Sequence, residues 1–245
     1  MDILNVAKKT YWNLYFKVLT RKSKDGVEYV YKKRKSDRLL IVFSSMIGKY
    51  NFMRALKNAS ADQLFISDCW ADNNSYYWFE HKEDYPETYT QNLIDSILLK
   101  RKYKEVITLG SSKGGTAAIY YGLKNKVNIV YAGACQYRVG DYLGRYHYST
   151  SPHKWEKVVG GGISDEWIEI LDHKLEKMIE SSKGCQTKIK LIYSTEEHTY
   201  LEHIAPLIQK LDECNIIHED QVEKFKDHST IGVVYKDAIM KYFNS

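Results

Sequence analysis

The sequence predicts an α/β domain with a mostly parallel central sheet, and three observations support this prediction. Short apolar runs rich in β-formers alternate with amphipathic helical segments along most of the chain. No hairpin signals separate these runs, so neighbouring strands are expected to run parallel and to be joined by helical crossovers. A Gly-x-Ser-x-Gly pentapeptide lies between one predicted strand and the helix that follows it.

The individual elements follow from the spacing of apolar residues. Residues 39–43 form a continuous apolar run, as expected of a strand that is buried on both faces of a sheet. Further strands are predicted at 63–67, 105–109, 127–132, 188–193 and within 215–225. Helices are predicted at 50–57, 88–99, 114–123, 164–179, 200–211 and 233–243.

Composition indicates a folded globular protein. Apolar residues make up 44% and charged residues 27% of the 245 residues, far from the signature of disorder. The net charge of +5 is mild, and the basic cluster at 32–35 is expected to be a solvated turn, with a surface for a polyanionic substrate as the alternative. No nucleic-acid-binding signature accompanies it, so we expect no nucleic-acid partner.

The termini and cysteines bear on the compartment. The four cysteines are widely spaced and favour a reducing environment. No run approaches the length of a membrane span, so we expect a cytoplasmic protein. Residues 3–19 show apolar residues at helical spacing beside lysines. This segment is expected to pack on its own domain or on a second subunit, as in a homo-oligomer; the alternative is peripheral association with the inner face of the membrane.

We expect residues 1–245 to form a single domain. Residues 1–37 would form an N-terminal helix and extension. The alternation of strand and helix breaks down after residue 136, and residues 137–185 are interpreted as a cap or insertion. Such an insertion would lie over the carboxyl ends of the strands, where open α/β sheets bind ligands, so substrate contacts are expected from it.

Ser112 is the candidate nucleophile. It has Gly110 and Gly114 two positions before and after it, which lets a strand and a helix approach closely around a strained serine, as in the nucleophile elbow of an α/β-hydrolase fold. Ser111 has Leu109 and Lys113 at the equivalent positions. The alternatives are a turn without chemistry and a phosphate-binding loop, but the spacing of a Walker loop is absent.

A serine hydroxyl needs a base and an orienting carboxylate, and in this fold the chain order is serine, acid, histidine. Glu197 is the preferred acid because it follows the predicted strand 188–193 by a short turn, with Glu196 as the fallback. Of the eight histidines, His228 lies between the last predicted strand and the last helix, where the fold presents its histidine. His198 is close enough in sequence to the acid to line the pocket instead.

Acyl transfer also needs donors for the developing oxyanion. The backbone amide of Lys113, directly after the nucleophile, is the first candidate, and Ser45, after the strand 39–43, is the second. The glycines at 160–162 are interpreted as a turn, since no Lys-Ser/Thr pair follows them. Nothing in the sequence resembles a metal site, so no metal is expected.

The chain resembles a bacterial family, the α/β-hydrolase-type polysaccharide O-acetyltransferases and related capsule-biosynthesis proteins. The resemblance rests on 42–45, 49–52, the elbow 109–115 and the segment 193–197, and it spans most of 38–243 in the order of elements. It implies Ser112 as nucleophile, Glu197 as acid and His228 as base. Glutamate stands where the nearest relatives have aspartate, and triads accept either acid.

The resemblance implies acetyl-CoA as co-substrate and a polysaccharide or oligosaccharide as acceptor, with association in a capsule-synthesis complex. We therefore expect a serine acyltransferase that carries an acetyl group on Ser112. The closest alternative is an esterase or deacetylase, which would use the same residues and differ only in the access of water to the acyl-enzyme. An alternative from another class is a catalytically silent protein that binds glycan or scaffolds a complex.

Overall fold

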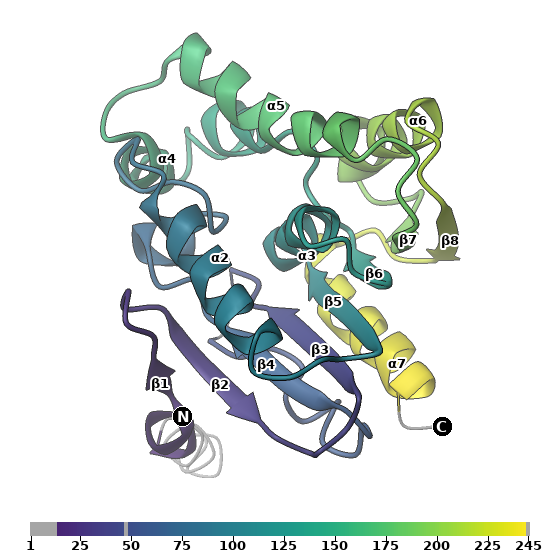
Figure 1. The fold of residues 1–245 in the computed structure, drawn as a ribbon. Coiled ribbons are helices and arrows are strands. Elements are labelled where there is room, and N and C mark those ends of the chain that lie inside the picture. The colour runs from purple at the N-terminus through teal and green to yellow at the C-terminus, as the bar shows by residue number, and fades with distance from the viewer. Residues whose placement is uncertain (1–13, 47–48, 244–245) are drawn as a thin grey trace, which may run out of the picture.

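A computed structural model describes residues 14–46 and 49–243 and shows an eight-stranded mixed sheet flanked by helices (Figure 1). The strand order is β1-β2-β4-β3-β5-β6-β7-β8, and every pairing from β4 to β8 is parallel. The strands are β1 Arg21–Lys22, β2 Glu28–Lys32, β3 Arg38–Phe43, β4 Asp62–Ile66, β5 Glu105–Ser111, β6 Ile129–Gly133, β7 Lys188–Ser194 and β8 His218–Glu223.

Helices connect β4 to β5, β5 to β6, β6 to β7 and β7 to β8, as the alternating pattern predicts. They are α2 Tyr85–Leu98, α3 Lys113–Lys124, α4 Pro152–Val159, α5 Asp165–Ser181, α6 Ala205–Glu213 and α7 Ile231–Phe243, with shorter turns η1 Ala71–Asn73, η2 Asp141–Tyr146, η3 Tyr200–Ile204 and η4 His228–Thr230. The turns η2 and η3 are π-helical. A helix also covers residues 14–19, and the rest of the predicted segment 3–19 lies outside the described residues.

The core lies on both faces of the sheet, which explains why β3 is apolar from Leu39 to Phe43. Leu39, Ile41 and Phe43 face one cluster, which α2, α3, α5 and α6 complete, whereas Leu40 and Val42 face a second cluster that includes α7. Figure 1 shows α2 and α3 in front of the sheet and α7 behind it. Because successive side chains of a strand point to opposite faces, a strand covered on both sides is expected to carry apolar residues at successive positions.

Two strands that the sequence did not predict precede the strand at 39–43. β1 and β2 form a hairpin within residues 1–37, predicted as a helix and extension, and this hairpin joins the sheet by antiparallel pairing of β2 with β4. Gly26 turns this hairpin with a φ of +86°, a conformation that glycine adopts without steric cost. The basic residues 33–35 after β2 are exposed, as predicted for a solvated turn.

The prediction of a helix at 50–57 is wrong, since this segment forms a series of turns. Phe52 has a φ of +62°, which interrupts a right-handed helix. The turns still bury Tyr50, Met53 and Leu56 against the second cluster. The spacing of apolar residues therefore indicated which side chains are buried, but the positive φ of Phe52 prevents a regular helix.

Residues 137–185 contain two different parts. The turn η2 and the helix α4 form an excursion, and α4 is tied to the chain after η1 because His81 and Lys82 donate backbone hydrogen bonds to Lys157 and Val158. The long helix α5 contacts α3 and α6 and serves as the crossover to β7. In Figure 1, α4 and α5 lie at the top of the view, beyond the sheet.

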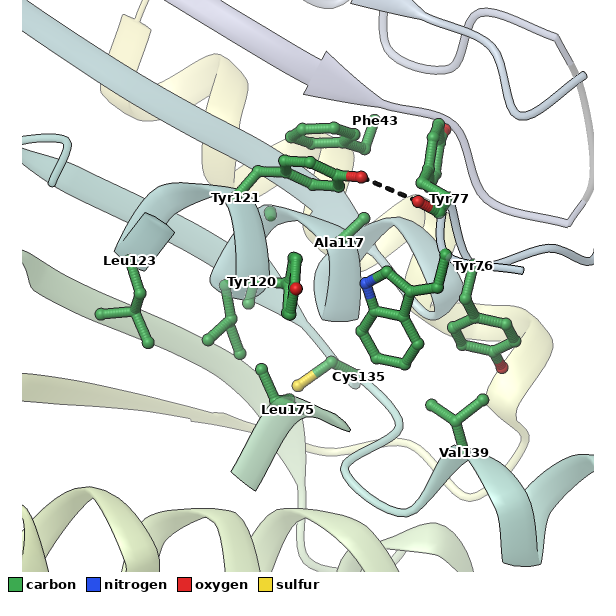
Figure 2. Close-up of a cluster of buried hydrophobic side chains, with 14 of the residues drawn as sticks. Phe43, Tyr76, Tyr77, Ala117, Tyr120, Tyr121, Leu123, Cys135, Val139 and Leu175 are labelled. Atoms are coloured by element: carbon green, nitrogen blue, oxygen red, sulfur yellow. Dashed lines mark hydrogen bonds between the residues drawn. The ribbon is translucent and has the colours of Figure 1, made fainter. Parts of the chain in front are cut away.

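Aromatic packing anchors α3, the helix that follows the elbow, to the loop after η1 (Figure 2). The Tyr121 ring stacks on Phe43 of β3 at a centroid distance of 5.2 Å, and its hydroxyl donates a hydrogen bond to the Tyr77 carbonyl at 2.7 Å. The Tyr77 hydroxyl in turn accepts from the backbone N–H of Ser44 at 2.7 Å. These contacts join the C-terminal half of α3, the loop after η1 and the end of β3.

No helix among the described residues combines the length and the apolar character that a membrane span requires. All four cysteines are free, and Cys135 and Cys214 are buried.

Candidate active site

The turn from β5 into α3 holds Ser112 in a conformation that L-residues rarely adopt. Its φ of 53° and ψ of −130° lie outside the helical and extended regions. The backbone N–H of Ser112 donates to the Gly133 carbonyl at 2.7 Å, and its own carbonyl accepts from Gly115 and Thr116 in the first turn of α3. Local strain of this kind persists only where the surroundings enforce it, and it is concentrated at functional sites.

The two flanking glycines are needed because backbone lies where their side chains would be. A Cβ on Gly110 would overlap the Gly114 carbonyl, and a Cβ on Gly114 would lie 2.6 Å from the carbonyl oxygen of Phe43. The structure thus gives a steric reason for the small residues that the sequence shows on both sides of Ser112.

We expect Gly114→Ala to destabilise the protein by about 1–3 kcal/mol or more, because the strand β3 must shift to admit the methyl group. Gly161→Ala is the matched control, since nothing lies within 4 Å of the added Cβ there. Urea unfolding of both variants measures the difference. Equal midpoints for the two would contradict the steric argument.

The structure brings Ser112, His228 and Glu197 together from three distant parts of the chain. The Nε2 atom of His228 lies 2.9 Å from the Ser112 Oγ, and its Nδ1 atom lies 2.6 Å from the Glu197 Oε1. The carboxylate is buried, with 3% of Glu197 exposed, whereas Glu196 is exposed. The geometry therefore connects Glu197 and not the fallback Glu196 to the imidazole.

Loops at the ends of β7 and β8 position the acid and the histidine. The Ser194 hydroxyl at the end of β7 accepts from the backbone N–H groups of Glu196 and Phe225, both at 3.1 Å, and so joins the two loops. The Asp227 carboxylate accepts from the Ser229 backbone N–H at 2.8 Å and starts the turn η4 at His228.

The environment of Glu197 favours its ionised form. Burial alone would raise the pKa of this carboxyl group, but hydrogen bonds from His228 and from the Thr199 hydroxyl at 2.6 Å outweigh burial, so the pKa is lowered. An ionised Glu197 accepts the Nδ1–H of His228 and leaves Nε2 as the acceptor for the Ser112 hydroxyl.

The two predicted oxyanion donors differ in whether their backbone N–H groups already have an acceptor. Lys113 opens α3, where a backbone N–H has no acceptor within the helix. Ser45 lines the same cavity as Ser112, but its N–H donates to the Asn51 Oδ1 at 2.8 Å. Ser45 has to exchange Asn51 for an oxyanion before it can serve, so its role stays a prediction.

The Lys113 side chain forms a buried ion pair beneath the elbow. Its Nζ lies 2.7 Å from the Asp68 Oδ2 and donates to the Asn73 carbonyl at 2.5 Å. The side chains of Lys113 and Asp68 are both inaccessible to solvent. Burial lowers the pKa of Lys113, and the Asp68 carboxylate offsets this only in part. Removing either partner would leave a buried charge unpaired, which is costly.

A cavity of about 440 Å³ opens over the Ser112 hydroxyl. Its wall joins the elbow and η4 to residues from η2, α4 and the segment after β3; these include Met46, Asn51, Phe52, Tyr142, Lys154, Ser229 and Ile231. His198, the other histidine near the acid, instead stacks on Tyr146 and lies 3.0 Å from its hydroxyl. In residues 14–46 and 49–243, no group of three or more potential metal ligands is close enough to hold an ion.

Sequence reasoning missed Gln136, which lies just after β6. Its Nε2 donates to the Ser112 Oγ at 3.1 Å, and the residue is fully buried. A polar residue shortly after a predicted parallel strand was the available signal, since the same rule pointed to Glu197.

Taken together, the sheet and the crossovers define an α/β-hydrolase fold, as predicted, with a serine, a histidine and a carboxylate in contact at the carboxyl ends of its strands. No protein-family model matches this chain, and no curated protein sequence matches it. Many solved structures do match it by fold.

The capsule O-acetyltransferase of Neisseria meningitidis serogroup A matches with a TM-score of 0.73 and 18% identity, over 92% of this chain and 94% of that one. A histidine-to-alanine mutant of that enzyme in complex with CoA matches with a TM-score of 0.70, 18% identity and the same coverage. FphF, a fluorophosphonate-binding serine hydrolase of Staphylococcus aureus, matches with a TM-score of 0.68 and 11% identity, over 93% of this chain and 97% of that one. The resemblance inferred from the sequence is thus confirmed at the level of the fold.

Proposed function

We propose that this protein is a serine acyltransferase that moves an acetyl group from acetyl-CoA to a hydroxyl of a bacterial capsular polysaccharide through an acyl-enzyme on Ser112. The observation that carries the proposal is the continuous hydrogen-bonded chain from the buried Glu197 through His228 to the Ser112 Oγ. A serine hydroxyl becomes an effective nucleophile when a base accepts its proton and a carboxylate orients that base.

In the first half-reaction, the Ser112 Oγ attacks the thioester carbonyl and its proton passes to the Nε2 of His228. The Oγ–C bond forms, the carbonyl oxygen takes up negative charge, and the Lys113 backbone N–H is assigned to stabilise that charge. When the C–S bond breaks, His228 returns the proton to the departing thiolate. Glu197 stays ionised throughout and stabilises the protonated imidazole.

In the second half-reaction, a hydroxyl group of the glycan replaces CoA at the acyl-enzyme. His228 removes its proton and the new O–C bond to the glycan forms. The Oγ–C bond of the acyl-enzyme then breaks, and His228 passes the proton to the Ser112 Oγ. Donor and acceptor thus use the same base and the same oxyanion donors in turn. Such an exchange gives ping-pong kinetics.

Two observations support a CoA thioester as the donor. A structural neighbour with the same fold binds CoA. In addition, Lys154 lines the cavity over Ser112, where a cation suits the phosphates of CoA. Among the cavity residues, none is an aspartate or a glutamate. The cavity therefore favours a ligand that carries negative charge.

The acetyltransferase similarity supports the polysaccharide acceptor, and the hydrolase neighbours support an esterase as the second candidate. An S-formylglutathione hydrolase of S. aureus and a ferulic acid esterase share the fold, with TM-scores of 0.57 and 0.61. The two candidates differ in whether water or a sugar hydroxyl reaches the acyl-enzyme.

Acetyl-CoA consumption measured with and without capsular oligosaccharide separates the two candidates. For a transferase we expect CoA release to rise at least ~10-fold with the acceptor present, because a poorly solvated acyl-enzyme waits for the sugar. The oligosaccharide should gain the mass of one acetyl group per transfer.

CoA release that is independent of the sugar, with free acetate as product, would identify a hydrolase instead. A protein that binds the oligosaccharide but neither releases CoA nor reacts with a fluorophosphonate would be a silent glycan-binding or scaffold protein.

A further inference from the structure

Gln136 is held in place by its own backbone, independently of its side chain. Its N–H donates to the Thr116 Oγ1 at 3.0 Å, and its carbonyl accepts from the same hydroxyl at 2.8 Å. Thr116 belongs to the first turn of α3, directly after the elbow. The position of Gln136 relative to Ser112 is therefore fixed through a single residue of the helix that carries the elbow.

The Gln136 side chain presents a donor to the nucleophile. Its Oε1 accepts from the Tyr76 hydroxyl at 3.3 Å, which leaves the Nε2 group to donate to the Ser112 Oγ at 3.1 Å. The Oγ accepts this bond and directs its own proton to His228, whose Nε2 lies 2.9 Å away. Since Gln136 is fully buried, water does not compete for the amide.

We propose that Gln136 is a further catalytic residue, whose amide stabilises the negative charge that develops on the Ser112 Oγ in both half-reactions. This inference rests on the proposed serine mechanism. When the Oγ attacks, the loss of its proton to His228 gives it anionic character, which diminishes as the Oγ–C bond forms. When that bond breaks, the Oγ takes up the bonding electron pair while it recovers the proton from His228.

The amide acts selectively on the two transition states. A donor hydrogen bond to an oxygen with anionic character is stronger than one to a neutral hydroxyl or to the ester oxygen of the acyl-enzyme. An interaction that strengthens only in the transition state raises kcat and not merely the affinity for substrate. Gln136 thus supplements the oxyanion donors, which act on the carbonyl oxygen and not on the Oγ.

The test compares Gln136→Met with the wild type in the stopped-flow hydrolysis of p-nitrophenyl acetate. The burst phase reports acylation, and the steady state reports loss of the acetyl group to water. We expect both rate constants to fall ~10–100-fold, less than for a full oxyanion donor because the proton moves to His228 as the charge forms. The burst amplitude, which counts competent active sites, should stay close to one per chain.

Gln63→Met is the matched control. Gln63 is also fully buried and donates through its Nε2 to the Leu56 carbonyl at 2.8 Å, but it lies in β4, away from the elbow. We expect this variant to keep both rate constants while it loses a comparable amount of thermal stability. A purely structural role of Gln136 would lower the burst amplitude and leave the rate constants per active site unchanged.

Gln136→Glu gives an isosteric second test. The carboxylate lacks the donor and places a like charge beside the developing oxyanion, so we expect a larger loss than in Gln136→Met at pH 8. The ratio of variant to wild-type rate should recover as the pH falls, because a protonated glutamic acid can donate again.

The inference is overturned if Gln136→Met and Gln136→Glu retain wild-type rate constants per active site. That result differs from a failure of the proposed function. If the proposed serine mechanism fails, Ser112→Ala still shows the burst. If only the role of Gln136 fails, Ser112→Ala abolishes the burst and the Gln136 variants keep the wild-type rate constants.

Discussion

Ser112→Ala abolishes both covalent labelling by a fluorophosphonate and transfer of the acetyl group. The expected loss of turnover is on the order of 10⁵-fold or more, because no acyl-enzyme can form without the Oγ and only binding and oxyanion stabilisation remain. Labelling is read by intact-protein mass spectrometry and turnover by release of CoA. The effect is one of chemistry, so thermal stability should not fall.

Ser111→Ala is the control for Ser112. Ser111 is the last residue of β5, is buried, and has no glycine two positions away on either side. It should retain the label at Ser112. A label that persists in Ser112→Ala and disappears in Ser111→Ala would show that the nucleophile had been assigned to the wrong serine.

Glu197→Gln is expected to lower kcat by about 10⁴-fold while it leaves the fold intact. A glutamine amide can donate to the Nδ1 of His228, which drives the imidazole proton onto Nε2. The Nε2 atom then cannot accept the proton of the Ser112 hydroxyl, although the distance of 2.9 Å is preserved. The measurement is the steady-state rate of acetyl transfer.

Glu196→Gln provides a control that differs by one position. Glu196 is exposed, whereas Glu197 is buried and lies 2.6 Å from the His228 Nδ1. The Glu196 variant should retain the wild-type rate. Full activity in Glu197→Gln together with a large loss in Glu196→Gln would exchange the two roles.

The arrangement of the candidate site was largely predictable from the sequence because it depends on chain order and on short-range sterics. Gly110 and Gly114 are needed because neighbouring backbone atoms occupy the space that a Cβ would fill at these positions. The candidates Glu197 and His228 follow from their positions after the last strands, which a parallel sheet brings to one edge. The glycines around Ser112 and the positions of Glu197 and His228 after predicted strands were thus enough to predict that these three residues lie close together.

The elements that escaped prediction depend on contacts that no local pattern encodes. β1 has only two residues, both exposed, so no periodicity could reveal it. The turns at 50–57 follow from the positive φ of Phe52, and the π-helical turns η2 and η3 differ from an α-helix by one residue per hydrogen bond. The position of Gln136 after a predicted strand marks it as a candidate, but its contact with the Ser112 Oγ depends on how the chain folds.

The cavity over Ser112 draws its reactive groups and its outer wall from separate stretches of the chain. Ser112 and His228 follow strands β5 and β8 of the sheet, whereas Tyr142 and Lys154 come from the excursion that holds η2 and α4. Under the proposed function, selection can therefore remodel the excursion to admit a new acceptor while Ser112 and His228 keep their positions on the sheet. Acceptor preference and catalytic power would then be free to diverge along separate evolutionary paths.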